Sequence, residues 1–234
     1  MATETEQIVE SEGEVFAEGY SGEVRRAPQA PGYCYKVPKL QGTPAREMIN
    51  QEKATHDLLV SLGVSTIPEY EIEEFRYVNA RGRLAIGVRA RMTDLSQGGR
   101  NLVCSLPDLV QLKQADVRLY ADLAAITRTR PVYNAPEFFA QLGEIIRLTR
   151  QAGITVSTGF MLVATHEGRL STVVGDYEDG VNLHATAWGI EQGWYSSVER
   201  YTMQVIELFP QMREQGMHFI QEMMEEMKRS IAQK

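Results

Sequence analysis

The chain has 234 residues, a formal net charge of −7 and 43% hydrophobic residues. These values exclude a disordered chain and predict one large domain or two small lobes around a sizeable core. The acidic balance disfavours binding to nucleic acid or to an anionic membrane surface, because both attract a basic excess. No apolar run approaches the roughly 20 residues that a membrane-spanning helix needs.

The N-terminal residues are polar and acidic, without the basic and apolar regions of a secretory signal peptide. We expect residues 1–12 to be a flexible N-terminus. The two cysteines, Cys34 and Cys104, lack zinc-binding spacing and favour reduced thiols in a cytoplasm. A cytoplasmic location is therefore expected, and export as an effector without a signal peptide stays an open alternative.

The first third of the chain has the pattern of short strands followed by a helix. Glycine-containing turns separate strands predicted at residues 14–18, 22–27 and 33–37. A helix is predicted from Thr43, with Pro44 at its first position, to Gly63 as its C-terminal cap. Two further strands are predicted at residues 69–78 and 83–92, the second with alternating apolar residues.

The second part of the chain is predicted to be mainly helical. Residues 96–105 are Gly-rich and polar and indicate a lobe boundary. Helices are predicted at about 115–129 and from Asn134, where Glu137 indicates a capping box. Apolar runs at 159–164 and 170–175 predict a hairpin, and the helical remainder is interrupted at Pro210. The order predicts an α+β architecture, with a five-stranded antiparallel lobe and one helix at residues 13–95 and a helical lobe at 96–234.

A glycine-containing segment, Glu18-Gly-Tyr-Ser-Gly-Glu-Val24, lies between the first two predicted strands. Gly19 and Gly22 let the backbone approach an anion, and the N–H groups of the turn can face phosphate oxygens. An ordinary hairpin turn is the commoner interpretation of such a short motif.

Lys36 lies in an otherwise apolar predicted strand, and Glu52 lies on the apolar stripe of the helix that follows. If both side chains point inward, each offsets the desolvation cost of the other, which predicts an ion pair. Two separate surface charges are the alternative, and Glu47 is a second candidate partner for Lys36.

An acidic cluster of Asp176, Glu178 and Asp179 follows the last strand of the predicted hairpin. Carboxylate oxygens are ligands that Mg²⁺ prefers, so the cluster is a candidate metal site. A solvated acidic turn is the commoner interpretation of such a cluster.

These features, in this order, resemble the protein kinase-like superfamily. The matching positions are Gly19, Gly22 and Val24 in the loop, followed by Lys36, Glu52 and Asp176. The resemblance implies a bilobal kinase-like fold in which Lys36 contacts the phosphates of ATP and Asp176 holds Mg²⁺. It further implies that Ser21 belongs to the nucleotide-binding loop, that Cys34 lies over the adenine, and that Met92 lies in a hinge of residues 91–95.

The segment after the predicted second helix departs from this family. The family has an Asp base there and an Asn metal ligand five residues later, whereas this chain has Thr155 and Phe160 at those positions. A threonine cannot accept the proton near neutral pH, and a phenylalanine cannot ligate a metal. Little chain follows Gly180, so the C-lobe is expected to be reduced.

The resemblance therefore implies a pseudokinase that acts through protein contacts and can still bind ATP. One alternative is an atypical ATP-dependent phosphotransferase that uses Asp176. Another is an interaction or structural protein without nucleotide binding.

The predicted last helix, residues 211–233, is amphipathic and acidic. Its apolar face is formed by Gly216, Ile220, Met223, Met227 and Ile231. One interpretation packs this face on the helix's own lobe. The other docks it on a protein partner or a second copy of the chain, because flexible methionines suit adaptable interfaces.

Overall fold

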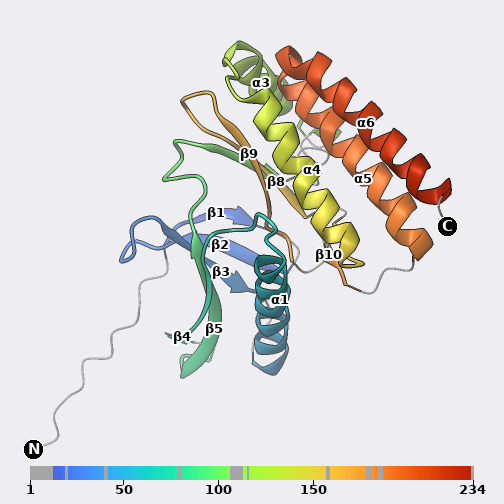
Figure 1. Cartoon of the computed structure of the whole chain (residues 1–234). Helices are drawn as coiled ribbons and strands as arrows, with labels where there is room; N and C mark the ends of the chain where they lie inside the picture. Colours follow the sequence, from blue (N-terminus) through green and yellow to red (C-terminus); the bar gives the residue numbers. More distant parts are fainter. Residues whose placement is uncertain are drawn as a thin grey trace, which may run out of the picture. The chain divides into compact units, whose positions relative to one another are not determined.

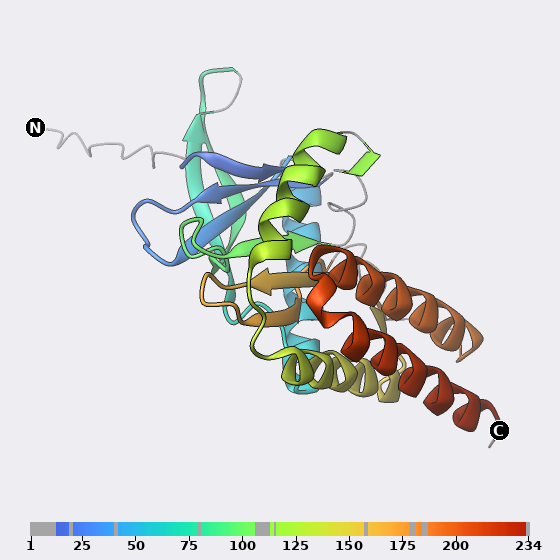
Figure 2. The ribbon, with the colours of Figure 1, turned by 90° about the horizontal axis from the view of Figure 1, so that it is seen from above.

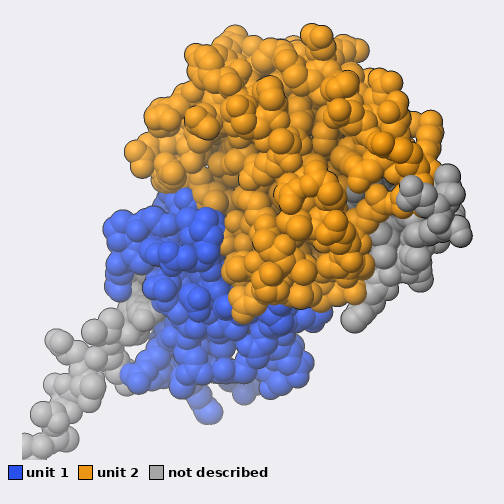
Figure 3. Space-filling model, viewed as in Figure 1, with its two compact units in different colours: residues 1–54, 68–94 blue, residues 55–67, 95–234 orange. Residues whose placement is uncertain are grey.

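The computed structural model is a mixed α+β structure (Figures 1 and 2). It describes residues 13–18, 21–39, 42–78, 81–105, 113–114, 116–156, 159–177, 181–183 and 187–232, without the side chains of 119, 187–196 and 231–232. The chain gathers into two compact units, one of residues 1–54 and 68–94 and one of residues 55–67 and 95–234 (Figure 3). Within the described ranges, no helix is both long and apolar enough to cross a membrane.

The first unit is built on a five-stranded antiparallel sheet with the strand order β1-β2-β3-β5-β4. Its strands are β1 Val15–Glu18, β2 Gly22–Arg26, β3 Tyr33–Pro38, β4 Tyr70–Val78 and β5 Leu84–Thr93. The predicted five-stranded sheet is thus confirmed. The strands could be predicted from glycine-containing turns and from the alternation of apolar residues, because both signals lie within a few neighbouring residues.

Helix α1, Thr43–Ser61, connects β3 to β4 and continues from the first unit into the second. Residues that recur at helical spacing along α1 are buried at Ile49, Glu52, Thr55, His56 and Leu59, whereas Met48 of the same stripe is half-buried. Gly63 takes a φ of +75°, which favours glycine, and its N–H donates to the carbonyl oxygen of Val60. The predicted helix and its glycine cap are therefore confirmed.

The second unit contains two small sheets. Strands β6 Leu102–Ser105, β8 Phe160–Ala164 and β9 Leu170–Val174 form one in the order β6-β8-β9, and β7 Thr155–Val156 pairs with β10 Val181–Asn182 in the other. The β8–β9 hairpin was predicted. The sequence indicated a lobe boundary and no strand over 96–105, whereas Leu102 to Ser105 form β6 and pair with β8.

The helices of the second unit are α3 Val117–Thr129, α4 Ala135–Gln151, α5 Ala187–Leu208 and α6 Arg213–Ala232. A short 3₁₀ turn, Pro210–Met212, joins α5 to α6, which lie side by side (Figures 1 and 2). On α6, Phe219, Ile220 and Met223 are buried. The described apolar face of the last helix thus packs on the chain's own unit, whereas the side chain of Ile231 lies outside the described residues.

The predicted capping box at Asn134 is wrong, because Asn134 makes no side-chain hydrogen bond to the start of α4. Its side-chain amide instead donates to the carbonyl oxygen of Leu170 over 2.7 Å and accepts from the N–H of Leu170 over 2.8 Å. Leu170 begins β9, an edge strand whose outer backbone groups need partners when buried. Asn134 supplies both a donor and an acceptor and fastens α4 to this edge.

Candidate functional site

Lys36 and Glu52 form an ion pair in which Nζ and Oε1 are 2.6 Å apart. Lys36 lies in β3, where it pairs across the sheet with Val24 of β2 and Ala90 of β5. The Glu52 side chain is only 2% exposed and that of Lys36 is 18% exposed. The predicted ion pair is confirmed, and Glu47 lies exposed on α1.

Tyr70, at the start of β4, completes this cluster and was not identified from the sequence. Its hydroxyl donates to the second carboxylate oxygen of Glu52 over 2.5 Å, and its side chain is fully buried. Both oxygens of the buried carboxylate thus have a donor, as a buried charge requires. Tyr70 pairs directly with Met92 of β5 and so shares the sheet face of Lys36, a register that alternation alone does not give.

The geometry leaves the Lys36 ammonium able to bind a further acceptor. An ammonium has three donors, and one of them bonds to Glu52. The side chain keeps 18% exposure while its partner is almost fully enclosed. A lysine fixed in this way can donate to an anionic oxygen such as that of a phosphate.

Gly22 lies on the same sheet face, opposite Pro38 in the β2–β3 pair. A Cβ at this position would lie 2.9 Å from the carbonyl oxygen of Val37 and 3.7 Å from Cε of Lys36. Glycine therefore keeps space open beside Lys36. Ser21 lies half-buried just before β2, whereas Gly19 falls outside the described residues.

Cys34 and Met92 pair across β3 and β5, next to the position of Lys36. Both are buried, and the Cys34 thiol donates to the carbonyl oxygen of Met92 over 3.7 Å. Burial, with a smaller contribution from the Asp94 carboxylate, raises the pKa of Cys34 to about 12. The thiol is therefore protonated at neutral pH and supplies apolar surface on the Lys36 face rather than a nucleophile.

Asp176 follows β9 in the second unit and is half-buried. Its predicted companions Glu178 and Asp179 lie outside the described residues. In the part of the chain that the structure describes, no group of three or more His, Cys, Asp or Glu side chains is arranged to hold a metal ion. The Mg²⁺ site thus stays a prediction that depends on Asp176.

The two positions expected for a catalytic base and a metal-ligating Asn are occupied by buried side chains of short strands. Thr155 pairs with Asn182 in the β7–β10 ladder and is 7% exposed. Phe160 begins β8 and stacks on Tyr201, with ring centroids 5.1 Å apart. Only residues 157–159 separate β7 from β8. This segment is too short for a loop that presents an Asp and an Asn five residues apart.

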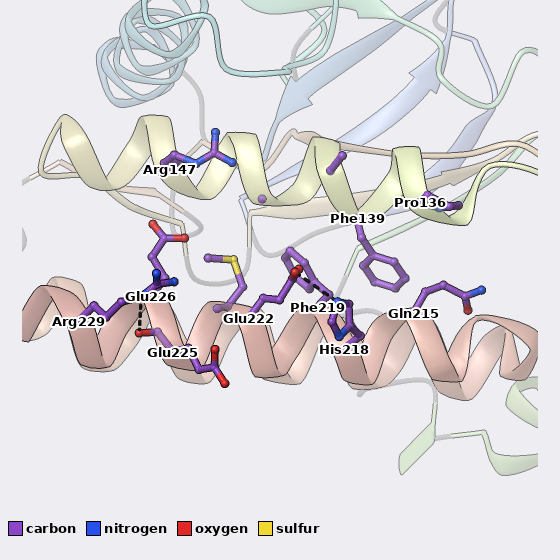
Figure 4. A pocket seen from close by; sticks show the side chains of 13 residues that line it. Pro136, Phe139, Arg147, Gln215, His218, Phe219, Glu222, Glu225, Glu226 and Arg229 are labelled. Atoms are coloured by element: carbon purple, nitrogen blue, oxygen red, sulfur yellow. Dashed lines mark hydrogen bonds and ion pairs between the residues drawn. The ribbon is translucent and has the colours of Figure 1, made fainter.

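A hollow of about 580 Å³ lies between α4 and α6 (Figure 4). Its floor includes Phe139 and Phe219, which are buried and stack with centroids 5.3 Å apart. Charged side chains on its rim contact one another, as His218 and Glu222 do over 3.2 Å. The described lining carries charges of both signs, so the hollow has no strong preference for a ligand of one charge.

No protein-family model matches the chain, and no curated protein matches its sequence.

Proposed function

We propose that the protein is a pseudokinase of the kinase-like fold, which binds ATP through Lys36 and has little or no phosphotransfer activity. The Lys36–Glu52 ion pair is the observation that carries the proposal. A buried ion pair is weak evidence for stability, because well-packed apolar residues are often at least as stabilising. Anion binding by the partly exposed Lys36 ammonium explains why charge is placed there.

The chain order of the surrounding elements supports the same assignment. A glycine-containing segment connects β1 to β2, a lysine lies on β3, and a glutamate on the next helix pairs with that lysine. The β8–β9 hairpin is then followed by Asp176. This is the order of parts in the kinase-like superfamily.

The residues on the sheet face that carries Lys36 suit a nucleotide. Lys36 would donate to the α- and β-phosphate oxygens of ATP, held in place by Glu52 and Tyr70. The backbone of Ser21 and Gly22, at the start of β2, would approach the phosphates. Apolar contacts to the adenine would come from Val24, Cys34 and Met92. The resemblance to the kinase-like superfamily further implies that Asp176 holds Mg²⁺.

Chemistry on the bound nucleotide is expected to be weak. Thr155 and Phe160 are buried in strands, and three residues connect β7 to β8. Loss of a general base typically costs about two to four decades of rate. The protein would then act mainly through protein contacts that nucleotide binding stabilises.

Thermal unfolding with and without ATP and Mg²⁺ tests nucleotide binding. A ligand at about 100 times its dissociation constant adds roughly 2.7 kcal/mol to stability, so the wild type should melt at a higher temperature with ATP. Lys36→Met should abolish this shift, and Lys228→Met, which removes the same charge from an exposed site on α6, should keep it. Glu52→Gln should reduce the shift more than Glu47→Gln.

A wild-type chain that shows no shift at any ATP concentration would instead be an interaction protein without a nucleotide site. A shift that persists in Lys36→Met would place the nucleotide elsewhere.

Transfer of radiolabelled phosphate from ATP tests the absence of catalysis. The wild type should transfer no more label than Asp176→Ala to itself or to protein acceptors. Robust transfer that Asp176→Ala abolishes would establish the atypical phosphotransferase in place of the pseudokinase.

A further inference from the structure

A second hollow, of about 460 Å³, lies where the end of α3 meets the connection between α5 and α6. We call it the arginine groove. Its charged lining residues are Arg128 of α3, Arg200 and Glu207 of α5, and Arg213 of α6. Among the described lining residues, three cations thus face one carboxylate, in a chain whose net charge is −7.

Glu207, the one carboxylate among the described residues that line the arginine groove, is already neutralised. Glu207 pairs with Lys113 over 2.6 Å, and this bond lowers the pKa of Glu207 from its ordinary value. Among the described residues, neither Arg200 nor Arg213 has an ion-pair or hydrogen-bond partner. Two arginines therefore keep their full set of planar donors for a carboxylate or another anion.

The arginine groove also exposes apolar side chains next to its cations. Met203 is 45% exposed and Met217 is 47% exposed, and each lies about one helical turn beyond an arginine of its own helix. Pro210, between the two helices, is exposed as well. Flexible thioethers suit a surface that adapts to an apolar side chain of a partner.

We propose that the arginine groove binds an acidic amphipathic peptide segment of a partner protein. Carboxylates of the peptide pair with Arg200 and Arg213, and its apolar side chains cover Met203 and Met217. Charge complementarity selects this partner, because the groove is basic on an acidic protein. Nucleic acid is disfavoured, since no aromatic side chain for base stacking is found among the lining residues that the structure describes.

Binding of a fluorescent peptide measured by anisotropy tests the proposal. The probe is a short synthetic helix with Glu on one face and Leu on the other, compared with the same peptide carrying Gln for Glu. We expect the acidic peptide to bind with a dissociation constant of about 1–100 µM and the Gln peptide to bind at least about tenfold more weakly. The double variant Arg200→Glu with Arg213→Glu should raise the dissociation constant of the acidic peptide by about tenfold or more.

Arg118→Glu is the control for each single groove substitution, because it makes the charge change of one of them at an exposed position of α3 that does not line the groove. It should leave the affinity within about twofold per altered charge. Equal losses in Arg118→Glu and in the groove variant would overturn the proposal, as would equal binding of the Gln peptide or no binding up to about 1 mM.

Two further outcomes identify a different occupant and so also overturn it. Inorganic phosphate that displaces the peptide and stabilises the wild type, but not the double variant, would make the groove a site for a free anion. Self-association in sedimentation that the double variant abolishes would assign the groove to a second copy. Neither outcome depends on Lys36, so this inference and the nucleotide proposal fail independently.

Discussion

Glu52 has a carboxylate at 2% exposure whose two oxygens accept hydrogen bonds from Lys36 and Tyr70. Each donor contributes more by satisfying a buried charge than an exposed hydrogen bond would. Because Glu52 is held from two sides, the position of the Lys36 ammonium is fixed before any anion arrives. The cluster is thus preorganised for binding.

Tyr70→Phe should lower the free energy of unfolding by about 1–3 kcal/mol, because it leaves one oxygen of Glu52 without a donor. Urea denaturation measures this difference. Tyr133→Phe removes the same hydroxyl from a side chain that is 73% exposed and should change stability by less than about 0.5 kcal/mol. Equal, small effects of the two substitutions would show that Tyr70 does not support Glu52.

Cys34 should react slowly with thiol reagents in the folded chain. Its pKa rises from 9.0 to about 12 through burial, which leaves about a thousandfold less thiolate at pH 8 than in the unfolded chain. Modification of a Cys104→Ala variant by a disulfide reagent, with and without denaturant, isolates Cys34. Similar rates in both conditions would contradict its burial on the sheet.

The same shift predicts a direction for stability at high pH. The thiol ionises near pH 9.0 in the unfolded chain and only near pH 12 in the folded chain. Below pH 9 it is protonated in both states, so it does not change the free energy of unfolding with pH. Above pH 9 the unfolded chain releases a proton first, and stability falls as the pH rises towards 12. Cys34→Ala should remove this part of the alkaline loss.

At the scale of elements, Asn134 is predicted to matter more than the residue expected to complete its capping box. Asn134→Ala leaves the buried N–H and carbonyl of Leu170 without partners and should cost about 2 kcal/mol or more. Glu137→Ala, at an exposed position, should cost less than about 0.5 kcal/mol. Thermal or urea unfolding gives both values, and the reverse order would restore the capping-box interpretation.

Helix α6 is expected to be part of the core of its unit. A chain that ends after Met212 loses Phe219, Ile220 and Met223, each of them buried. Three such losses are comparable with a typical stability of about 5–15 kcal/mol, because each costs about 2–5 kcal/mol. Calorimetry should show no cooperative transition for the truncated chain. A folded truncated chain that loses only a partner or self-association would identify α6 as an interface.

Elements with a local pattern were predictable from the sequence, and elements without one were not. The strands of the five-stranded sheet and α1 carry alternation, helical spacing and glycine caps within their own residues. Strands β7 and β10 have two residues each, too few to show a period, and exist through pairing with each other. Strand β6 follows Gly98 and Gly99, whose turn signal obscured the apolar run after them.

At the scale of the whole molecule, the candidate site was predictable where a charged residue interrupted an apolar sequence pattern. Lys36 in an apolar strand and Glu52 on an apolar stripe predicted their ion pair. Tyr70 fits its strand and gave no such signal. The arginine groove gave none either, because its cations come from three helices and converge only in the folded unit.

We therefore propose two separate anion-binding sites on an acidic chain, one in each unit. Lys36 belongs to the unit of residues 1–54 and 68–94, and the arginine groove belongs to the other. Since they share no residue, a variant of one leaves the chemistry of the other intact. Each can be measured in the full chain.

Isothermal titration of ATP with Mg²⁺ into the full chain is the most direct test of the central claim. If Lys36 holds the nucleotide, the wild type should bind about one ATP per chain in a saturable way. Lys36→Met should lose this binding and Lys228→Met should retain it. Equal binding by the Lys36→Met chain, or no binding by the wild type up to about 1 mM ATP, would contradict it.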